Sequence, residues 1–208
     1  MATDAMATDA NEETQGYPLE IRGEYPEDPS RWLWLVKWFL AIPHFIILIL
    51  LTVVTIIVWI IAIFAILFTA RYPQGLFNFT VGVSRWWWRV SFYCGVLGTD
   101  RYPPFSLATD DDYPADLYVR YPERLSRLRV VFKWWLMALP HYIVLSLIGY
   151  LGLALSIFAG VVMLFTKRYP GDMFGVQMAF NRWNWRVQGY ISLWYDDYPP
   201  FEFDARSG

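Results

Sequence analysis

The sequence lacks most of the residues from which catalytic and metal sites are built. Its 208 residues include one cysteine, Cys94, and two histidines, so an internal disulfide is impossible and no CxxC pair or zinc motif occurs. A nucleophile elbow, a phosphate-binding loop and a dinucleotide fingerprint are also absent. The net charge of −2 gives no bulk attraction to nucleic acid. We therefore expect a non-enzymatic protein with no cofactor and no nucleic-acid partner.

Charge is also missing from two long stretches, residues 38–70 and 134–166. Apolar residues make up 56% of the chain and aromatic residues 20%, more than a soluble domain of this size carries. As one helix, each stretch would be about 50 Å long, against a hydrocarbon core of about 30 Å. These features predict an integral membrane protein in which each stretch is divided in some way.

Both stretches belong to an internal repeat with an offset of 96 or 97 residues. We expect a tail at 1–16, a first repeat at 17–106, a linker at 107–112, a second repeat at 113–203 and a tail at 204–208. The matching landmarks are Tyr25-Pro26-Glu27 with Tyr121-Pro122-Glu123, Pro43-His44 with Pro140-His141, Arg71-Tyr72-Pro73 with Arg168-Tyr169-Pro170, Arg85-Trp86 with Arg182-Trp183, and Tyr102-Pro103-Pro104-Phe105 with Tyr198-Pro199-Pro200-Phe201.

These landmarks resemble those of a family of bacterial membrane proteins catalogued as domain of unknown function 4389. The resemblance covers residues 17–106 and 113–203 and depends on the combination of motifs, since none is specific alone. The second copy departs from the first at Asn184 and Asp172, where the first has Trp87 and Gly75. The resemblance implies a bacterial membrane protein and supplies no activity, cofactor or partner.

Two arrangements fit the apolar stretches. The preferred one is a helical hairpin in each repeat, with spans at 32–51, 54–70, 129–148 and 151–167. It places all 17 Lys and Arg residues on one side, which the positive-inside rule identifies as the cytoplasm. Lys37 and Lys133 would then extend to the headgroups. The turn would lie at positions that carry glycine in one copy and threonine in the other, namely Gly149, Gly152, Thr52 and Thr55.

The alternative is a short interfacial helix that ends at a proline, Pro43 or Pro140, followed by a single span of about 24 residues. This arrangement would invert the two copies across the membrane. With the hairpin instead, we expect a multi-pass protein of the bacterial cytoplasmic membrane with both termini in the cytoplasm.

After each apolar stretch the spacing of apolar residues predicts an amphipathic helix. Its polar face carries an arginine pair, Arg85 and Arg89 in the first repeat and Arg182 and Arg186 in the second. A helix lying in the interface would bring these arginines to lipid phosphates, anionic ones above all. The alternatives are a solvated face with arginines stacked on tryptophan, and packing of the helix on the other repeat.

The only histidines, His44 and His141, follow the matching prolines inside the apolar stretches. An intramembrane polar group is a functional candidate. Each could be a neutral histidine bonded to backbone groups freed by the proline, or part of a polar relay. Together they could also bind a metal or haem. No further ligand set accompanies them, which favours the structural role.

The expected fold class is all-α: an integral membrane protein of two tandem repeats, each with a transmembrane hairpin followed by an amphipathic interfacial helix. We expect a non-catalytic accessory or scaffold protein that organises membrane lipids or a larger membrane complex, or that forms a homo-oligomer. The alternative is a small transporter or channel with its pathway between the repeats. Polar groups for that pathway are few: Thr52, Thr55, Ser146 and Ser156 beside the histidines.

Overall fold

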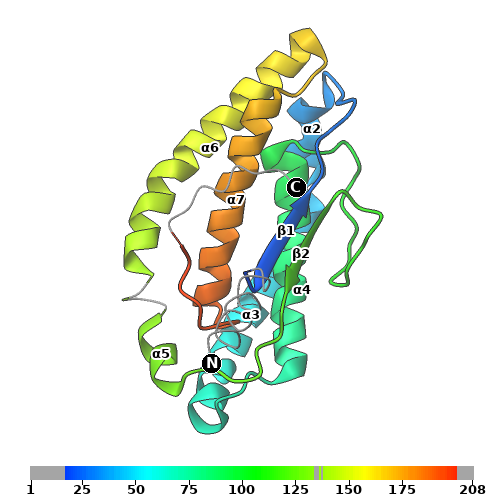
Figure 1. Cartoon of the computed structure of the whole chain (residues 1–208). Helices are drawn as coiled ribbons and strands as arrows, with labels where there is room; N and C mark the ends of the chain where they lie inside the picture. The colour runs from blue at the N-terminus through cyan, green and yellow to red at the C-terminus, as the bar shows by residue number, and fades with distance from the viewer. Residues whose placement is uncertain (1–16, 134–135, 137, 201–208) are drawn as a thin grey trace, which may run out of the picture.

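The computed structural model describes residues 17–133, 136 and 138–200, which form a mostly helical molecule (Figure 1). Each repeat contributes a strand, a short helix, a long apolar helix and a second long helix, in that order. The first repeat contains β1 (Leu19–Gly23), α2 (Leu33–Leu40), α3 (Ile42–Thr69), α4 (Gln74–Ser91) and a π-helical turn, η1 (Phe92–Val96). The second contains β2 (Ala115–Val119), α5 (Arg127–Phe132), α6 (Leu139–Thr166) and α7 (Gly171–Ile191).

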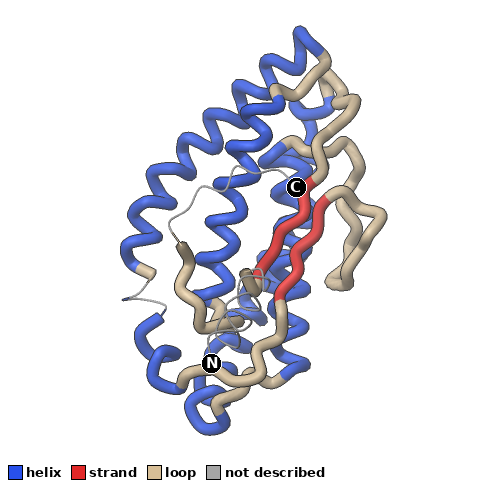
Figure 2. Tube along the Cα trace, viewed as in Figure 1, coloured by secondary structure: helices blue, strands red, loops and turns tan. Residues whose placement is uncertain are grey.

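The two strands pair as an antiparallel ribbon, an element that the all-α prediction did not include (Figure 2). At its centre Ile21 lies opposite Leu117, and at one end Leu19 lies opposite Val119. Ile21 and Leu117 are the same position of the two repeats, 96 residues apart. Each strand therefore pairs with its own counterpart, about a pseudo-two-fold axis that passes through the central pair.

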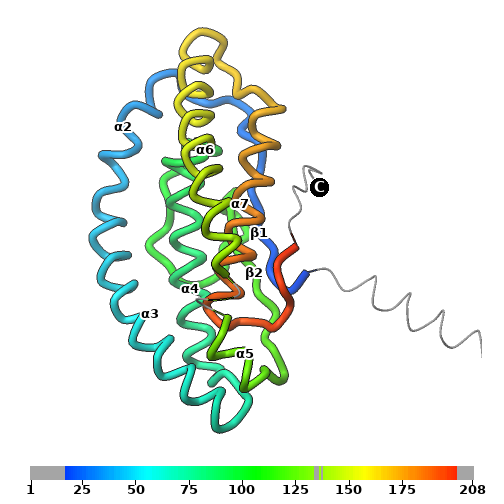
Figure 3. Tube along the Cα trace, turned by 90° about the vertical axis from the view of Figure 1, so that its left-hand side faces the viewer, coloured from blue at the N-terminus to red at the C-terminus, as the bar shows by residue number. Residues whose placement is uncertain are grey.

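The same axis relates contacts elsewhere in the molecule. The Tyr25 hydroxyl donates a hydrogen bond to the carbonyl oxygen of Tyr169, and its counterpart Tyr121 donates to the carbonyl oxygen of Tyr72. As a result, α3 and α6 run in opposite directions, each starting at the end of the molecule where the other finishes (Figures 1 and 3).

Three layers are stacked along this axis. The middle layer is α4 and α7, which pack on β2 and β1 respectively on one side and on α3 and α6 on the other. The main apolar core extends from the ribbon through this middle layer to α3 and α6 and takes residues from both repeats, including Leu19, Trp88, Phe174 and Trp194. The ribbon lies midway along the combined length of the two long helices (Figures 1 and 3).

Each apolar stretch contains one long unbroken helix, which corrects the hairpin prediction. Both α3 and α6 have 28 residues, a length of about 42 Å. Thr52 donates to the Leu48 carbonyl one turn earlier at 2.7 Å, a bond that threonine makes inside a continuous helix. A side chain at Gly152 would meet Gln177 of α7. Gly152 therefore lies inside a continuous helix packed on α7 and does not form a turn.

The break in each stretch comes before the proline, as in the alternative arrangement. α2 ends at Leu40 and α3 begins at Ile42, with Pro43 in the first turn, where a helix needs no N–H donor. At their far ends both long helices stop on a left-handed residue, Ala70 or Lys167, each with φ of 57°. This conformation closes a helix but is unfavourable for residues other than glycine.

Candidate functional site

The outer sides of α3 and α6 are apolar and exposed. The buried positions of α3 form a single stripe, so most of the circumference of this helix points away from the protein. Neither helix contains a charged residue, and both are long and apolar enough to cross a membrane. Exposed apolar surface of this extent is typical of a site that contacts a membrane or another protein. Exposed side chains include Ile46, Leu50, Val53 and Ile57 of α3 and Leu147, Leu151, Leu153 and Phe158 of α6.

On the opposite side of the molecule, Arg85 and Arg89 of α4 bind Asp116 of β2. The Arg85 Nε atom lies 2.9 Å from Asp116 Oδ1, and the Arg89 Nη2 atom lies 3.1 Å from Oδ2. The side chains of Arg89 and Asp116 are 0% exposed. Burial lowers the pKa of Arg85, and the Asp116 carboxylate opposes that shift. The arginines also donate to the carbonyl oxygens of Leu107 and Ala108.

Two arginines four residues apart on a helix repel each other unless an anion lies between them. Here that anion is a carboxylate of the protein itself. The sequence analysis assigned the position to a lipid phosphate. The structure gives it to Asp116, which comes from a strand that sequence reasoning missed. The only signal in the sequence is the short apolar–polar alternation of residues 19–22, which is too brief to predict a strand alone.

The equivalent groups of the second repeat are arranged differently. Glu20 takes the place of Asp116 and is exposed. Arg182 lines an open groove together with Glu20, while the Arg186 guanidinium lies 4.9 Å from the centre of the Tyr17 ring. Contact of Arg182 and Arg186 with lipid headgroups stays a prediction.

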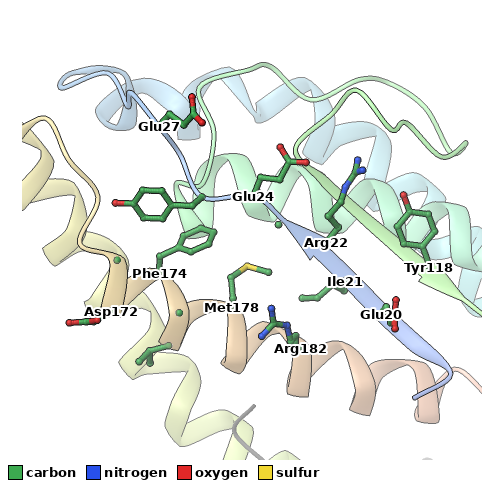
Figure 4. Close-up of a pocket in the computed structure, with 15 residues that line it drawn as sticks. Glu20, Ile21, Arg22, Glu24, Glu27, Tyr118, Asp172, Phe174, Met178 and Arg182 are labelled. Carbon is green, nitrogen blue, oxygen red and sulfur yellow. The ribbon is translucent and has the colours of Figure 1, made fainter. Parts of the chain in front are cut away.

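The groove has a volume of about 1110 Å³, large enough for a small molecule or a short peptide segment. It lies between β1 and the first half of α7 (Figure 4). Its lining is acidic on balance, since four carboxylates face two guanidinium groups around an apolar floor. The charged residues are Glu20, Glu24, Glu27, Asp172, Arg22 and Arg182, and the floor contains Ile21, Phe174 and Met178.

The two histidines lie near the starts of α3 and α6, which run in opposite directions, and each ring packs in a separate group of aromatic residues (Figure 3). His44 is buried, and its Nδ1 atom accepts a hydrogen bond from the Trp86 indole at 2.9 Å. Its ring stacks on Phe105 with 3.9 Å between centroids. His141 lies edge-on to Trp183. A metal or haem shared by both histidines is therefore incompatible with this fold, and the described ranges contain no cluster of metal-binding side chains.

The two lysines expected at the headgroups are instead buried in ion pairs. Lys37 Nζ lies 2.8 Å from Asp100 Oδ1, and Lys133 pairs with Asp196 in the same way. Burial lowers the pKa of both lysines, and the carboxylates oppose that shift. In both repeats the carboxylate also accepts a bond from a serine N–H before the short helix. In each repeat, therefore, one aspartate joins the short helix, α2 or α5, to the segment that follows α4 or α7.

Comparison with known proteins gives one result. The family model described as "Domain of unknown function (DUF4389)" matches residues 31–106 and 127–202, one match in each repeat. No curated protein and no solved structure matches the chain.

Proposed function

We propose that this protein is a non-catalytic scaffold held in a membrane. The chain belongs to the DUF4389 family and contains two tandem copies of its domain. The family description assigns no activity, so the proposal depends on geometry. The observation that carries it is the exposed apolar surface of α3 and α6. Lipid chains are the apolar phase that two uncharged 28-residue helices fit best.

The ends of these helices support contact with lipid headgroups. Arg71 follows α3, Lys167 and Arg168 follow α6, and all three are exposed. Exposed aromatic residues, Trp32 and Phe39, lie at or in α2 beside the start of α3. Cations and tryptophan in such positions suit the headgroup region, where each cation near an anionic surface contributes about 1 kcal/mol. Anionic lipids are therefore the proposed lipid partners, and the bacterial cytoplasmic membrane is the proposed location.

The inner polar groups favour a scaffold over a carrier or an enzyme. Gln177 of α7 donates to the Gly152 carbonyl at 2.9 Å and also to the Ser156 hydroxyl, both on α6. The Thr52 hydroxyl accepts a hydrogen bond from the Trp87 indole N–H at 3.0 Å. A transport pathway would need polar groups such as these in its wall. Here they form hydrogen bonds that join α6 to α7 and α3 to α4. Their role supports a rigid body that organises lipids around it.

Membrane fractionation tests this proposal. The protein should stay with membranes through high salt and alkaline carbonate, and only detergent should release it. Changing Ile57 and Leu153, 54% and 50% exposed, to Asp should lower the membrane-bound fraction. The control is Glu20→Gln with Arg120→Gln, which alters charge on the ribbon side and should leave that fraction unchanged. A wild-type protein that is soluble and monomeric without detergent would overturn the proposal.

Lipid organisation has its own readout. Native mass spectrometry of the detergent-extracted protein should show retained anionic lipid. Arg71→Gln with Arg168→Gln should reduce this retention, because both cations leave the ends of the long helices. Arg120→Gln alone, on the ribbon side, is the matched control and should retain lipid as the wild type does. Equal retention in all three proteins would contradict a lipid-organising role.

A further inference from the structure

We infer that the bilayer meets this molecule from one side only: the α3 and α6 layer enters one leaflet lengthwise, and the chain does not cross the membrane. This inference rests on the proposed membrane function and specifies the surface that carries it. Three observations lead to it: the position of the ribbon, the polarity of the ribbon side, and the pseudo-two-fold axis.

The ribbon lies midway along the combined length of α3 and α6 (Figures 1 and 3). Symmetry requires this position, because the axis through Ile21 and Leu117 also exchanges the two antiparallel long helices. If α3 and α6 stood upright across a bilayer, the ribbon would lie at the level of the bilayer centre.

The ribbon side cannot lie at that level against lipid. Its exposed residues include Glu20, Glu24 and Arg120 on or beside the strands, and Asp111 and Asp112 in the loop before β2. Charged side chains are costly at the bilayer centre. Within residues 17–133 and 138–200 the ribbon has two strands, so each has an outer edge, and open sheet edges do not occur in the hydrocarbon region. The acidic groove beside Arg182 lies on the same side.

Lying flat removes both conflicts. With the axis along the membrane normal, the two repeats meet the bilayer in the same way, and the ribbon faces water. A layer of helices about 10 Å thick fits within one leaflet, which supplies half of a core of about 30 Å. The exposed cations Arg71 and Arg168 then lie at the rim of the inserted layer, level with the headgroups.

Cysteine accessibility tests this orientation. Three single replacements, Arg71→Cys, Arg168→Cys and Asp111→Cys, are labelled with a membrane-impermeant maleimide in right-side-out and inside-out vesicles. All three should react in the same type of vesicle and in no other. Native Cys94 is 3% exposed and serves as an unlabelled background; Cys94→Ala versions repeat the measurement.

Labelling of Arg71→Cys and Arg168→Cys from opposite sides would overturn the inference. It would mean that the long helices cross the membrane and that another protein surface, such as a second copy, covers the ribbon. A membrane-bound protein with this result keeps the proposed function and loses only the orientation. A protein absent from the membrane fraction loses both.

Depth measurement gives an independent test. Spin labels at Ile46, Val53 and Ile60, all exposed on α3, report immersion through their contrasting accessibility to oxygen and to a water-soluble nickel complex. A helix lying flat should place all three at one depth. A profile in which depth changes steadily along the helix would contradict the inference.

Discussion

Trp88 of α4 meets Trp185 of α7 edge to face, with ring centroids 6.4 Å apart and ring planes at 77°. The two tryptophans occupy the same position of the two repeats, 97 residues apart, so the pair lies beside the pseudo-two-fold axis. The Trp88 indole also donates to the Arg22 carbonyl of β1 at 2.8 Å. One aromatic pair therefore joins both middle helices to the ribbon, and the two repeats form a single folded body.

The buried cluster at Asp116 should dominate the stability of this body. Asp116→Asn removes the carboxylate shared by Arg85 and Arg89 and leaves a fully buried guanidinium without its counter-ion. Breaking a buried pair in this way costs about 3–5 kcal/mol. The control is Glu20→Gln, the equivalent residue of the other repeat, which is exposed and should change stability by less than about 0.5 kcal/mol. Denaturant unfolding in detergent compares the two, and equal losses would contradict the cluster's role.

Gly160 should be intolerant of a side chain. A Cβ atom there would lie 2.9 Å from the Trp34 ring of the other repeat, so Gly160→Ala must displace a packed indole. We expect a loss of about 1–3 kcal/mol. Gly149→Ala on the same helix is the matched control, because no atom lies within 4 Å of its Cβ position, and it should gain about 0.5–1 kcal/mol. Thermal unfolding of both variants checks the contrast.

The left-handed residue after α6 offers a stabilising substitution. Lys167 has φ of 57° and is exposed, so Lys167→Gly relieves backbone strain and loses little packing. We expect a gain of about 1 kcal/mol. Ala154→Gly in the middle of α6 should instead lose about 0.5–1 kcal/mol. Similar shifts of the melting temperature in both variants would show that the strain at Lys167 is not significant.

Cys94 should make stability depend on pH in the alkaline range. Burial raises the pKa of its thiol from 9.0 to about 11, so the folded protein keeps a proton that the unfolded chain releases above pH 9. The stabilisation is complete below pH 9 and is lost as pH rises towards 11. Relative to Cys94→Ala, wild type should lose roughly 2–3 kcal/mol across that window. Unfolding free energies that change in parallel for both proteins would contradict this assignment.

Sequence reasoning recovered the parts of the fold that depend on local pattern. The repeat and the apolar helices are visible in residue order, and the break before Pro43 matches the arrangement given as the alternative to the hairpin. The hairpin was wrong because two kinds of evidence had another cause. Gly152 lies inside the continuous helix α6, and the argument from positive charges assumed that each apolar stretch folds back on itself.

The parts that sequence missed depend on contacts between distant residues. Five residues around Ile21 are too few and too polar to indicate a strand unless their partner near Leu117 is known. Arg89 and Lys37 belong to residue types that normally stay in water, so only the positions of Asp116 and Asp100 in space explain their burial.

The self-pairing ribbon also bears on how this chain arose. A single repeat contains both partners of the ribbon pairing and of the Trp88–Trp185 contact, so two unlinked copies could assemble as a symmetric homodimer. Joining them through the linker makes that assembly unimolecular and independent of concentration. Fusion also allows the two halves to differ. Asp116 is buried in ion pairs with Arg85 and Arg89, whereas the equivalent Glu20 is exposed and lines the groove. A homodimer encoded by one repeat must carry the same residue in both places, whereas the fused chain can use one half for stability and vary the other.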